Sequence, residues 1–304
     1  MRVFLTGASG YLGGVLARHL ALLPEVNGIT AIGRTQPSVS HGKLTFLRMD
    51  VRSPDLAVAM AGHDVVVHTA CVVLWPAKMS VQERDEININ GTHNVARAAL
   101  VNKVRRFIHA SSMAVYDPRL VAGQTDVNEE FPKGKGDTSF YYWNAKAAAE
   151  PILANILGAK TILTFLRPIY IIGQGNRKLV QSYKKYAIMF RGRNPRRQFI
   201  HEDDVAMAFM QAVRADMHGE FNVVPDDFVR LSEVWDIVGA KFVPTLPLSM
   251  ARLIAAMRWR FLGSPIHPSW VEDMLVDFTG SNEKLKSTGW TPRYGSAEAL
   301  RSAL

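Results

Sequence analysis

Cysteine is nearly absent from this chain of 304 residues, which contains only Cys71. A single thiol excludes an internal disulfide and suits a reducing compartment, so we expect a cytoplasmic protein. No uncharged apolar run reaches the ~18 residues that a membrane-spanning helix needs, and the opening MRVFLTGASG predicts no signal peptide. The sequence has no Cys/His zinc spacing and no RNA-binding signature, so we predict neither a metal site nor a nucleic-acid partner.

Acidic residues are missing from one segment of the chain. Residues 175–197 contain eight Lys or Arg and no Asp or Glu, in a protein whose net charge is +9. This basic segment either attracts an anionic ligand or is a solvated surface. The run at 249–263, SMARLIAAMRWRFLG, is also basic and apolar. We favour a helix of a small lobe with Arg caps there, with a membrane or partner surface as the alternative.

Short apolar runs alternate with helical patterns through the first two thirds of the chain. Strands are predicted at 2–7, 28–34, 44–51, 64–70, 105–112 and 161–168. Helices are predicted at 11–23, 53–62, 143–157 and in a long region that ends near 102. Continuous apolar strands separated by helices are typical of a parallel sheet covered on both faces. The predicted fold class is therefore α/β, a doubly wound Rossmann sheet with a small C-terminal substrate-binding lobe.

The strand-helix rhythm breaks after Pro168. We expect 1–172 to form the dinucleotide-binding domain and to receive 199–224, where a helix and a strand-like GEFNVV follow. The substrate lobe is then 173–198 together with the proline-containing tail 225–304.

Three glycines follow the first predicted strand in TGASGYLGG, where Gly7, Gly10 and Gly13 are spaced as GxxGxxG. Glycine permits the tight turn and the close approach of backbone to a pyrophosphate, and the N-terminus of the next helix faces that negative charge. The order strand, loop and helix is the one this function requires. We therefore predict a dinucleotide site here.

The second strand ends at Gly33 followed by Arg34, where NAD-preferring folds usually have an acid for the ribose 2′-hydroxyl. A guanidinium suits a 2′-phosphate, so we favour NADP, with NAD as the alternative. Asp50 and Val51 end the third strand, where they could contact the adenine.

The stretch FYYWNAK contains two tyrosines and a lysine. Tyr142 and Lys146 are four residues apart and share a helix face, whereas Tyr141 has Ala145 at the matching position. We therefore predict that Tyr142 takes part in the reaction and that Tyr141 has only a packing role.

The order and separation of several motifs resemble the extended short-chain dehydrogenase/reductase family, the group that contains NAD-dependent epimerases and dehydratases. The motifs are TGASGYLG, DV at 50–51, HTA at 68–70, NINGT at 88–92, SSMAVY at 111–116, YxxxK at 142–146, LRPIYIIG at 166–173, RQFIHEDDVA at 197–206 and STGWTPRY at 287–294. The resemblance covers nearly the whole chain. It implies Ser112, Tyr142 and Lys146 as the catalytic residues, with Ser112 and Arg197 contacting the substrate.

The cofactor contacts expected from the glycine loop, the strand ends and the resemblance together are Gly7, Ser9, Gly10, Tyr11, Leu12, Gly13, Arg34, Asp50, Val51, Thr69, Ala70, Asn88, Tyr142, Lys146, Pro168, Ile169 and Ile171. Among these, Asn88 is expected to steady the loop beside the cofactor, and Pro168, Ile169 and Ile171 to line its nicotinamide end. Free tyrosine is a poor base at neutral pH. A lysine ammonium and an oxidised nicotinamide would stabilise the tyrosinate, while Ser112 polarises the substrate oxygen.

Three departures from the family pattern bear on the reaction. Met113 and Ala114 follow Ser112 where dehydratases have an Asp-Glu pair, so dehydration is not expected. The run 71–75, CVVLW, is apolar where epimerases often have a lysine. The segment between Gly173 and Arg197 is shorter than the one with which sugar-nucleotide enzymes usually bind the nucleotide. We expect an NADP-preferring oxidoreductase or epimerase that transfers hydride at a carbonyl or alcohol carbon. A nucleotide-sugar epimerase with retained NAD, or a non-catalytic NADP(H)-sensing module, is the alternative. The family often forms homodimers through helices equivalent to those around 78–100 and 140–157.

Overall fold

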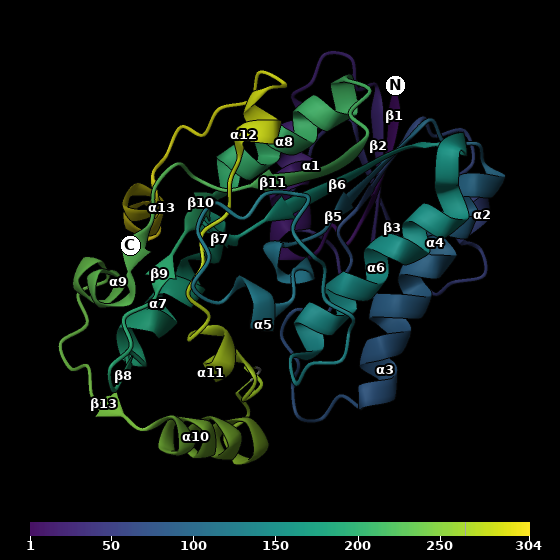
Figure 1. Cartoon of the computed structure of the whole chain (residues 1–304). Coiled ribbons are helices and arrows are strands. Elements are labelled where there is room, and N and C mark those ends of the chain that lie inside the picture. The colour runs from purple at the N-terminus through teal and green to yellow at the C-terminus, as the bar shows by residue number, and fades with distance from the viewer. Residues whose placement is uncertain (265) are drawn as a thin grey trace.

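A central sheet of seven parallel strands organises the chain, whose computed structural model describes residues 1–264 and 266–304 (Figure 1). Across the sheet the strands are β3 (Leu44–Arg48), β2 (Gly28–Gly33), β1 (Arg2–Thr6), β4 (Val65–His68), β5 (Arg106–Ala110), β6 (Ile162–Pro168) and β11 (Gly219–Val223). The strand order reverses between β1 and β4, which is where such sheets bind ligands at their carboxyl edge. The predicted doubly wound Rossmann sheet is confirmed.

Helices cover both faces of this sheet, because alternate side chains of each strand point to opposite sides. Helices α1 (Tyr11–Ala21) and α8 (Glu202–Arg214) pack on the face to which β1 contributes Val3 and Leu5. On the other face, Phe4 packs in the core formed with α2 (Leu56–Ala59), α4 (Gly91–Val101) and α6 (Tyr141–Leu157). All residues of β4 and β5 are buried, as expected for central strands of a parallel sheet covered on both faces.

Two predicted helices differ from the observed ones. Helix α2 has four residues, because Pro54 precedes it and Gly62, with φ of +72°, ends the segment. The long helical region is divided into α3 (Val81–Asp85), a π-helical turn η1 (Glu86–Asn90) and α4. The π-turn carries Asn88, whose side chain bonds outside the helix, and such turns often mark functional sites.

The remaining short elements are η2 (Met113–Val115), α5 (Pro118–Val121), η3 (Gly158–Lys160), β7 (Tyr170–Ile172), η4 (Gln174–Asn176), α7 (Arg177–Lys185), β8 (Met189–Phe190), β9 (Arg196–Arg197), β10 (Phe199–His201), β12 (Val229–Arg230), α9 (Leu231–Ile237), β13 (Thr245–Leu246), α10 (Leu248–Phe261), α11 (Trp270–Asp273), α12 (Glu283–Lys286) and α13 (Ser296–Ser302). Many of them surround a separate apolar core that includes Phe199, Trp235 and Leu300. Later in the tail, however, Leu285 and Trp290 pack in the core beside α8, and the Trp290 Nε1 donates to the Asp204 carbonyl at 3.0 Å. The tail therefore contacts both cores, and the division into two domains stays a prediction.

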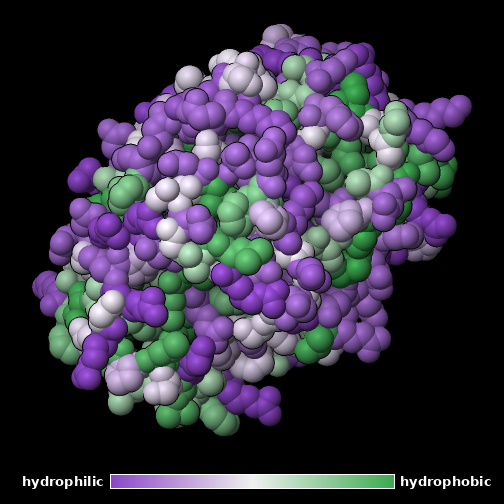
Figure 2. All heavy atoms as spheres, in the orientation of Figure 1, coloured by the Kyte–Doolittle hydropathy of each residue, from purple (hydrophilic) through white to green (hydrophobic). Residues whose placement is uncertain are grey.

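The surface over α10 is more apolar than its surroundings. Hydrophobic side chains interrupt the hydrophilic surface along the lower edge of the molecule, where α10 lies (Figure 2). Among the described residues, no helix combines the length and the hydropathy that crossing a membrane would need.

A buried ion pair fixes α6 to the sheet. The Arg167 guanidinium on β6 donates from Nε and Nη2 to the two carboxylate oxygens of Glu150 on α6, at 2.9 and 2.7 Å. Both side chains are at most 1% exposed. Glu150 also accepts from Ser111 Oγ at 2.7 Å and from Lys133 Nζ at 3.1 Å, so its charge is well compensated.

Replacing Arg167 alone should strongly destabilise the fold, since the substitution leaves the Glu150 carboxylate buried without its main partner. We expect Arg167→Met to lower the free energy of unfolding by about 3–5 kcal/mol, measured by urea denaturation. Arg105→Met, which removes an exposed pair with Asp216, is the matched control and should cost less than about 1 kcal/mol. Equal losses in the two variants would contradict the importance of the buried pair.

The same pair should give a pH-dependent difference in stability. Burial, the largest single effect, raises the pKa of Glu150, but the hydrogen bonds and charge of Arg167 together with Lys133 and Ser111 outweigh it and hold the pKa below the usual 4.5. A carboxyl with a lowered pKa stabilises the fold fully above its unfolded pKa and less as the pH falls through the folded value. The stability gap between the parent and Arg167→Met should therefore narrow below about pH 4.5. A gap that is constant from neutral to acid pH would exclude this linkage.

Candidate functional site

The glycine loop lies tightly between the ends of β1 and β4. Gly7 has φ of +75°, and a Cβ there would come within 2.7 Å of the Ala70 nitrogen and the Thr69 Oγ1. A Cβ on Gly13 would approach the Gly7 carbonyl oxygen to 2.2 Å. Both positions therefore require glycine, the first for backbone conformation and the second for close packing of α1 on the loop.

Helix α1 presents an N-terminus suited to an anion. Gly10 is its N-cap and has no side-chain cap, and the first turn contains no acidic residue. The N–H groups of this turn, which include Tyr11, Leu12 and Gly13, have no carbonyl partners within the helix. Because Ser9 and Gly10 are exposed, these donors and the helix dipole can reach a phosphate. The loop thus fits the pyrophosphate of a dinucleotide.

The expected adenosine end is positively charged. A Cβ on Gly33 would lie 2.8 Å from Ser9 Oγ, so a larger side chain there would have to displace that hydroxyl, and Arg34 beside it is exposed. The Asp50 carboxylate accepts from Arg52 Nε at 2.8 Å and from Nη2 at 3.1 Å. The hydrogen bond from Arg52 lowers the pKa of Asp50, and Arg34 lowers it further. The Val51 carbonyl accepts from the Asn94 amide at 2.8 Å.

Asn88 holds the segment that follows β4. Its side-chain oxygen accepts from the Val72 N–H at 2.7 Å, and its amide nitrogen donates to the Val72 carbonyl at 3.3 Å. Thr69 and Ala70, just before this segment, bond back to Thr6 at the end of β1. The loop after β4 is thereby fixed next to the glycine loop.

Tyr142 and Lys146 lie one turn apart on the same face of α6. The Lys146 Nζ lies 5.8 Å from the centre of the Tyr142 ring and donates to the Ala110 carbonyl at 2.6 Å, at the carboxyl end of β5. The Lys146 side chain is buried, so its charge acts through little water. The pair predicted from spacing is therefore assembled at the edge where the glycine loop lies.

Two buried histidines lie beside Lys146, and their role was not anticipated from the sequence. His68 contacts Thr6 Oγ1 through Nδ1 at 2.7 Å and Thr92 Oγ1 through Nε2 at 3.1 Å. Burial lowers the pKa of His68 to about 3, with Lys146 lowering it further, and the same two causes lower that of His109 well below its usual value. Both imidazoles are therefore neutral at neutral pH, and the positive charge that acts on them is that of Lys146.

Ser112, in the turn after β5, lies near Tyr142 of α6. It caps the turn after β5, accepting from the Ala114 N–H at 3.1 Å, and its hydroxyl donates to the Pro168 carbonyl at 3.4 Å. Burial raises the pKa of Tyr142 above 10.0, Cys71 raises it further, and the nearby Ser112 hydroxyl lowers it. Ile169 is buried behind Pro168, and Ile171 follows in β7. Ser112, Tyr142 and Pro168 thus converge on one small volume.

Aromatic side chains wall this volume on the lobe side. The Trp270 ring from α11 lies 5.5 Å from the Tyr142 ring at a 30° tilt, and its Nε1 donates to the Tyr141 hydroxyl at 3.3 Å. Tyr141 itself donates to the Val73 carbonyl and packs edge-on against Trp75. The sequence offered no signal for Trp270, since 128 positions separate it from Tyr142 and it carries no motif.

Arg197, expected to contact the substrate, is buried, and both of its terminal guanidinium nitrogens donate to other groups of the chain. Its Nη2 donates to the Asp273 carbonyl at 3.0 Å and its Nη1 to the Val276 carbonyl at 3.1 Å. The guanidinium therefore supports the chain around α11. A direct contact between Arg197 and substrate stays a prediction.

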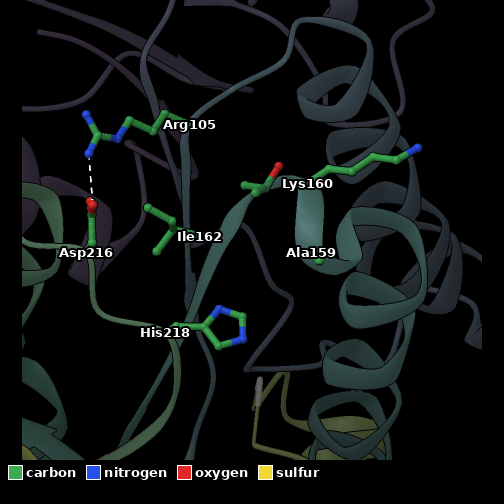
Figure 3. Close-up of a pocket in the computed structure, with 7 residues that line it drawn as sticks. Arg105, Ala159, Lys160, Ile162, Asp216 and His218 are labelled. Carbon is green, nitrogen blue, oxygen red and sulfur yellow. Dashed lines mark hydrogen bonds and ion pairs between the residues drawn. The ribbon is translucent and has the colours of Figure 1, made fainter.

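A separate recess lies at the opposite edge of the sheet (Figure 3). It is lined by Arg105, Asp216, His218 and Ile162, with Arg105 Nη2 donating to Asp216 at 2.8 Å. Arg105 and Ile162 lie where β5 and β6 begin. Ligands of doubly wound sheets bind at the carboxyl ends of the strands, so this recess is not our candidate site.

The chain is similar in sequence to a number of curated proteins. An uncharacterized protein of Mycobacterium tuberculosis is 28% identical over 260 residues, covering 80% of this chain and 67% of that protein. A 3-beta-hydroxysteroid dehydrogenase of Mycolicibacterium neoaurum is 30% identical over 193 residues, covering 60% of this chain and 50% of the enzyme.

The fold is also similar to that of a solved enzyme. UDP-glucuronic acid 4-epimerase from Bacillus cereus, in complex with NAD, superimposes with a TM-score of 0.75 at 18% identity, covering 99% of this chain and 97% of the epimerase. At this identity the likeness concerns the fold. The profile of the NAD dependent epimerase/dehydratase family matches residues 3–224, which hold the glycine loop, Ser112, Tyr142 and Lys146. With that match over most of its length, the chain belongs to the NAD dependent epimerase/dehydratase family of enzymes.

Proposed function

We propose that this protein transfers hydride between a nicotinamide dinucleotide and the carbon of a secondary alcohol or its carbonyl. The observation that carries the proposal is the convergence of Tyr142, Lys146 and Ser112 at the carboxyl end of β5. The glycine loop, which fits a pyrophosphate, lies two strands away at the end of β1.

Each of the three residues has a distinct part in this reaction. The nicotinamide, when bound, supplies or accepts the hydride. Ser112 donates a hydrogen bond to the substrate oxygen as negative charge develops on it. Tyr142 gives its proton to that oxygen during reduction and takes the proton back during oxidation. The Lys146 ammonium on the same helix face stabilises the tyrosinate that forms.

The surroundings of Tyr142 favour a substrate with an apolar body. Trp270 and Tyr141 are aromatic neighbours, and the adjoining segment 71–75 is apolar. Arg197 donates to backbone carbonyls instead of facing an open site, which weighs against recognition of a substrate pyrophosphate. The 3-beta-hydroxysteroid dehydrogenase among the relatives acts, by its name, on such a molecule, and only about half of its length is matched.

A nucleotide-sugar epimerase is the second candidate. It is favoured by the similarity to UDP-glucuronic acid 4-epimerase, which extends over nearly the whole of both chains. An epimerase oxidises and reduces its substrate in one cycle and therefore retains its dinucleotide, whereas a dehydrogenase exchanges it.

Tyr142→Phe should lower turnover by about 100- to 10,000-fold, since general acid-base catalysis contributes an effect of that size. Dinucleotide affinity should stay nearly unchanged, because the phenyl ring still fills the same space. Turnover would be assayed on a panel of lipophilic secondary alcohols, including 3β-hydroxysteroids, and on UDP-sugars. Tyr141→Phe is the matched control and should retain most activity. Full activity of Tyr142→Phe would refute the catalytic assignment.

Arg34 should determine the preference for NADP over NAD. We expect Arg34→Leu to weaken NADP⁺ binding by about 10- to 100-fold, the value of a charge-assisted hydrogen bond, and to leave NAD⁺ binding unchanged. Arg97→Leu, an exposed arginine on α4, is the control. Isothermal titration calorimetry measures both affinities. Tighter binding of NAD⁺ than of NADP⁺ by the parent protein would contradict the proposed preference.

The dinucleotide carried by the purified protein separates the two candidate functions. We expect protein denatured after purification to release far less than one equivalent of dinucleotide, quantified by chromatography, because a dehydrogenase exchanges its cosubstrate each cycle. Release of nearly one equivalent of NAD would instead support the epimerase and would count against Arg34 as a 2′-phosphate ligand.

A further inference from the structure

Helix α10 exposes a continuous apolar stripe. Met250, Leu253, Ile254, Met257 and Phe261 follow the three- and four-residue spacing of one helix face, and Leu262 continues it. Phe261 and Leu262 are each 77% exposed and Leu253 is 60% exposed, whereas Ala251 is the one residue of α10 that is buried. Large contiguous apolar patches on a soluble surface generally mark interaction sites.

Basic side chains flank this stripe. Arg260 on α10 is exposed, and Arg258 stacks on Tyr186 with its guanidinium carbon 3.5 Å from the ring centre. Lys185, beside Tyr186 at the end of α7, lies with its Nζ 5.2 Å from the same ring. Arg252 is partly neutralised by Glu272 at 2.7 Å. The apolar face is therefore bordered by positive charge.

The inner side of α10 is connected to the aromatic wall of the candidate site. Trp259 donates from Nε1 to the Trp75 carbonyl at 2.7 Å, and the two indole rings lie 5.6 Å apart. Trp75 in turn packs against Tyr141, the neighbour of Tyr142. The aromatic side chains of Trp259, Trp75 and Tyr141 thus connect α10 to the candidate site.

We propose that the exposed stripe of α10, with Leu262, docks on the surface of an anionic phospholipid bilayer. The apolar side chains enter the boundary between headgroups and acyl chains, and Arg258, Arg260 and Lys185 lie at the level of the phosphates. A second copy of the chain fits less well, since a two-fold contact would bring these basic flanks against one another. The proposal does not depend on the catalytic assignment.

Sedimentation with phospholipid vesicles tests this proposal on the full-length protein. We expect binding to phosphatidylcholine vesicles that contain phosphatidylglycerol and much weaker binding to phosphatidylcholine alone. Because basic residues contribute, raising the ionic strength should weaken the binding. Failure to bind anionic vesicles at low salt, or equal binding to vesicles with and without phosphatidylglycerol, would overturn the proposal.

Two variants keep the test specific. Phe261→Glu combined with Leu262→Glu should weaken vesicle partitioning by at least about tenfold. Each substitution removes an apolar side chain whose transfer from water into the bilayer would favour binding. Val58→Glu on α2 is the matched control, because Val58 is 78% exposed and lies away from α10, and it should bind as the parent does. Equal binding by all three proteins would contradict the assignment to α10.

The oligomeric state in the absence of lipid gives an independent outcome. We expect the parent protein and the Phe261→Glu, Leu262→Glu variant to have the same mass by light scattering. A parent dimer that dissociates in the variant would show that a second copy covers α10 and would overturn the lipid assignment.

Discussion

The buried Glu150–Arg167 pair is the constraint on which the candidate site depends. Helix α6 carries Tyr142, Lys146 and Glu150 at four-residue intervals, so anchoring Glu150 to β6 fixes the direction of the other two. Ser111, at the end of β5, bonds to the same carboxylate, and its neighbour Ser112 faces Tyr142. One ion pair therefore sets the mutual positions of three proposed catalytic side chains. The desolvation cost of burying Glu150 is offset by four hydrogen bonds from three residues, Arg167, Lys133 and Ser111.

Local chemistry made much of the fold predictable. Strands such as β4 are buried on both faces and read as unbroken apolar runs, and the loop at Gly7 and Gly13 has no room for a side chain. Tyr142 and Lys146 could be paired because helix periodicity alone puts them on one face. Trp270 and the bonds of Arg197 could not be predicted, since both depend on how the tail packs, which no local pattern encodes. The exposed face of α10 could not be predicted either, because its residues favour a packed lobe helix in the sequence.

The two sides of the candidate site differ in chemistry. The dinucleotide side is built from backbone donors and from the exposed Arg34, and it suits phosphates. On the lobe side, Trp270, Tyr141 and Trp75 present aromatic rings. This contrast matches a reaction between a charged cofactor and a lipophilic alcohol. The apolar surface of α10, with its basic border, extends this apolar side of the site to the outside of the molecule.

The proposed catalysis requires that the pKa of Tyr142 fall when an oxidised dinucleotide binds, so that the hydroxyl can exchange its proton with the substrate. The direct measurement is the tyrosinate absorbance of the protein minus that of Tyr142→Phe, titrated with and without NADP⁺. Without dinucleotide, burial should keep the pKa of Tyr142 above 10.0. With NADP⁺, the nicotinamide charge should lower the pKa of Tyr142, and Lys146→Met should raise that pKa both with and without the dinucleotide. A pKa that does not respond to the dinucleotide would contradict the assignment of Tyr142 as the catalytic acid.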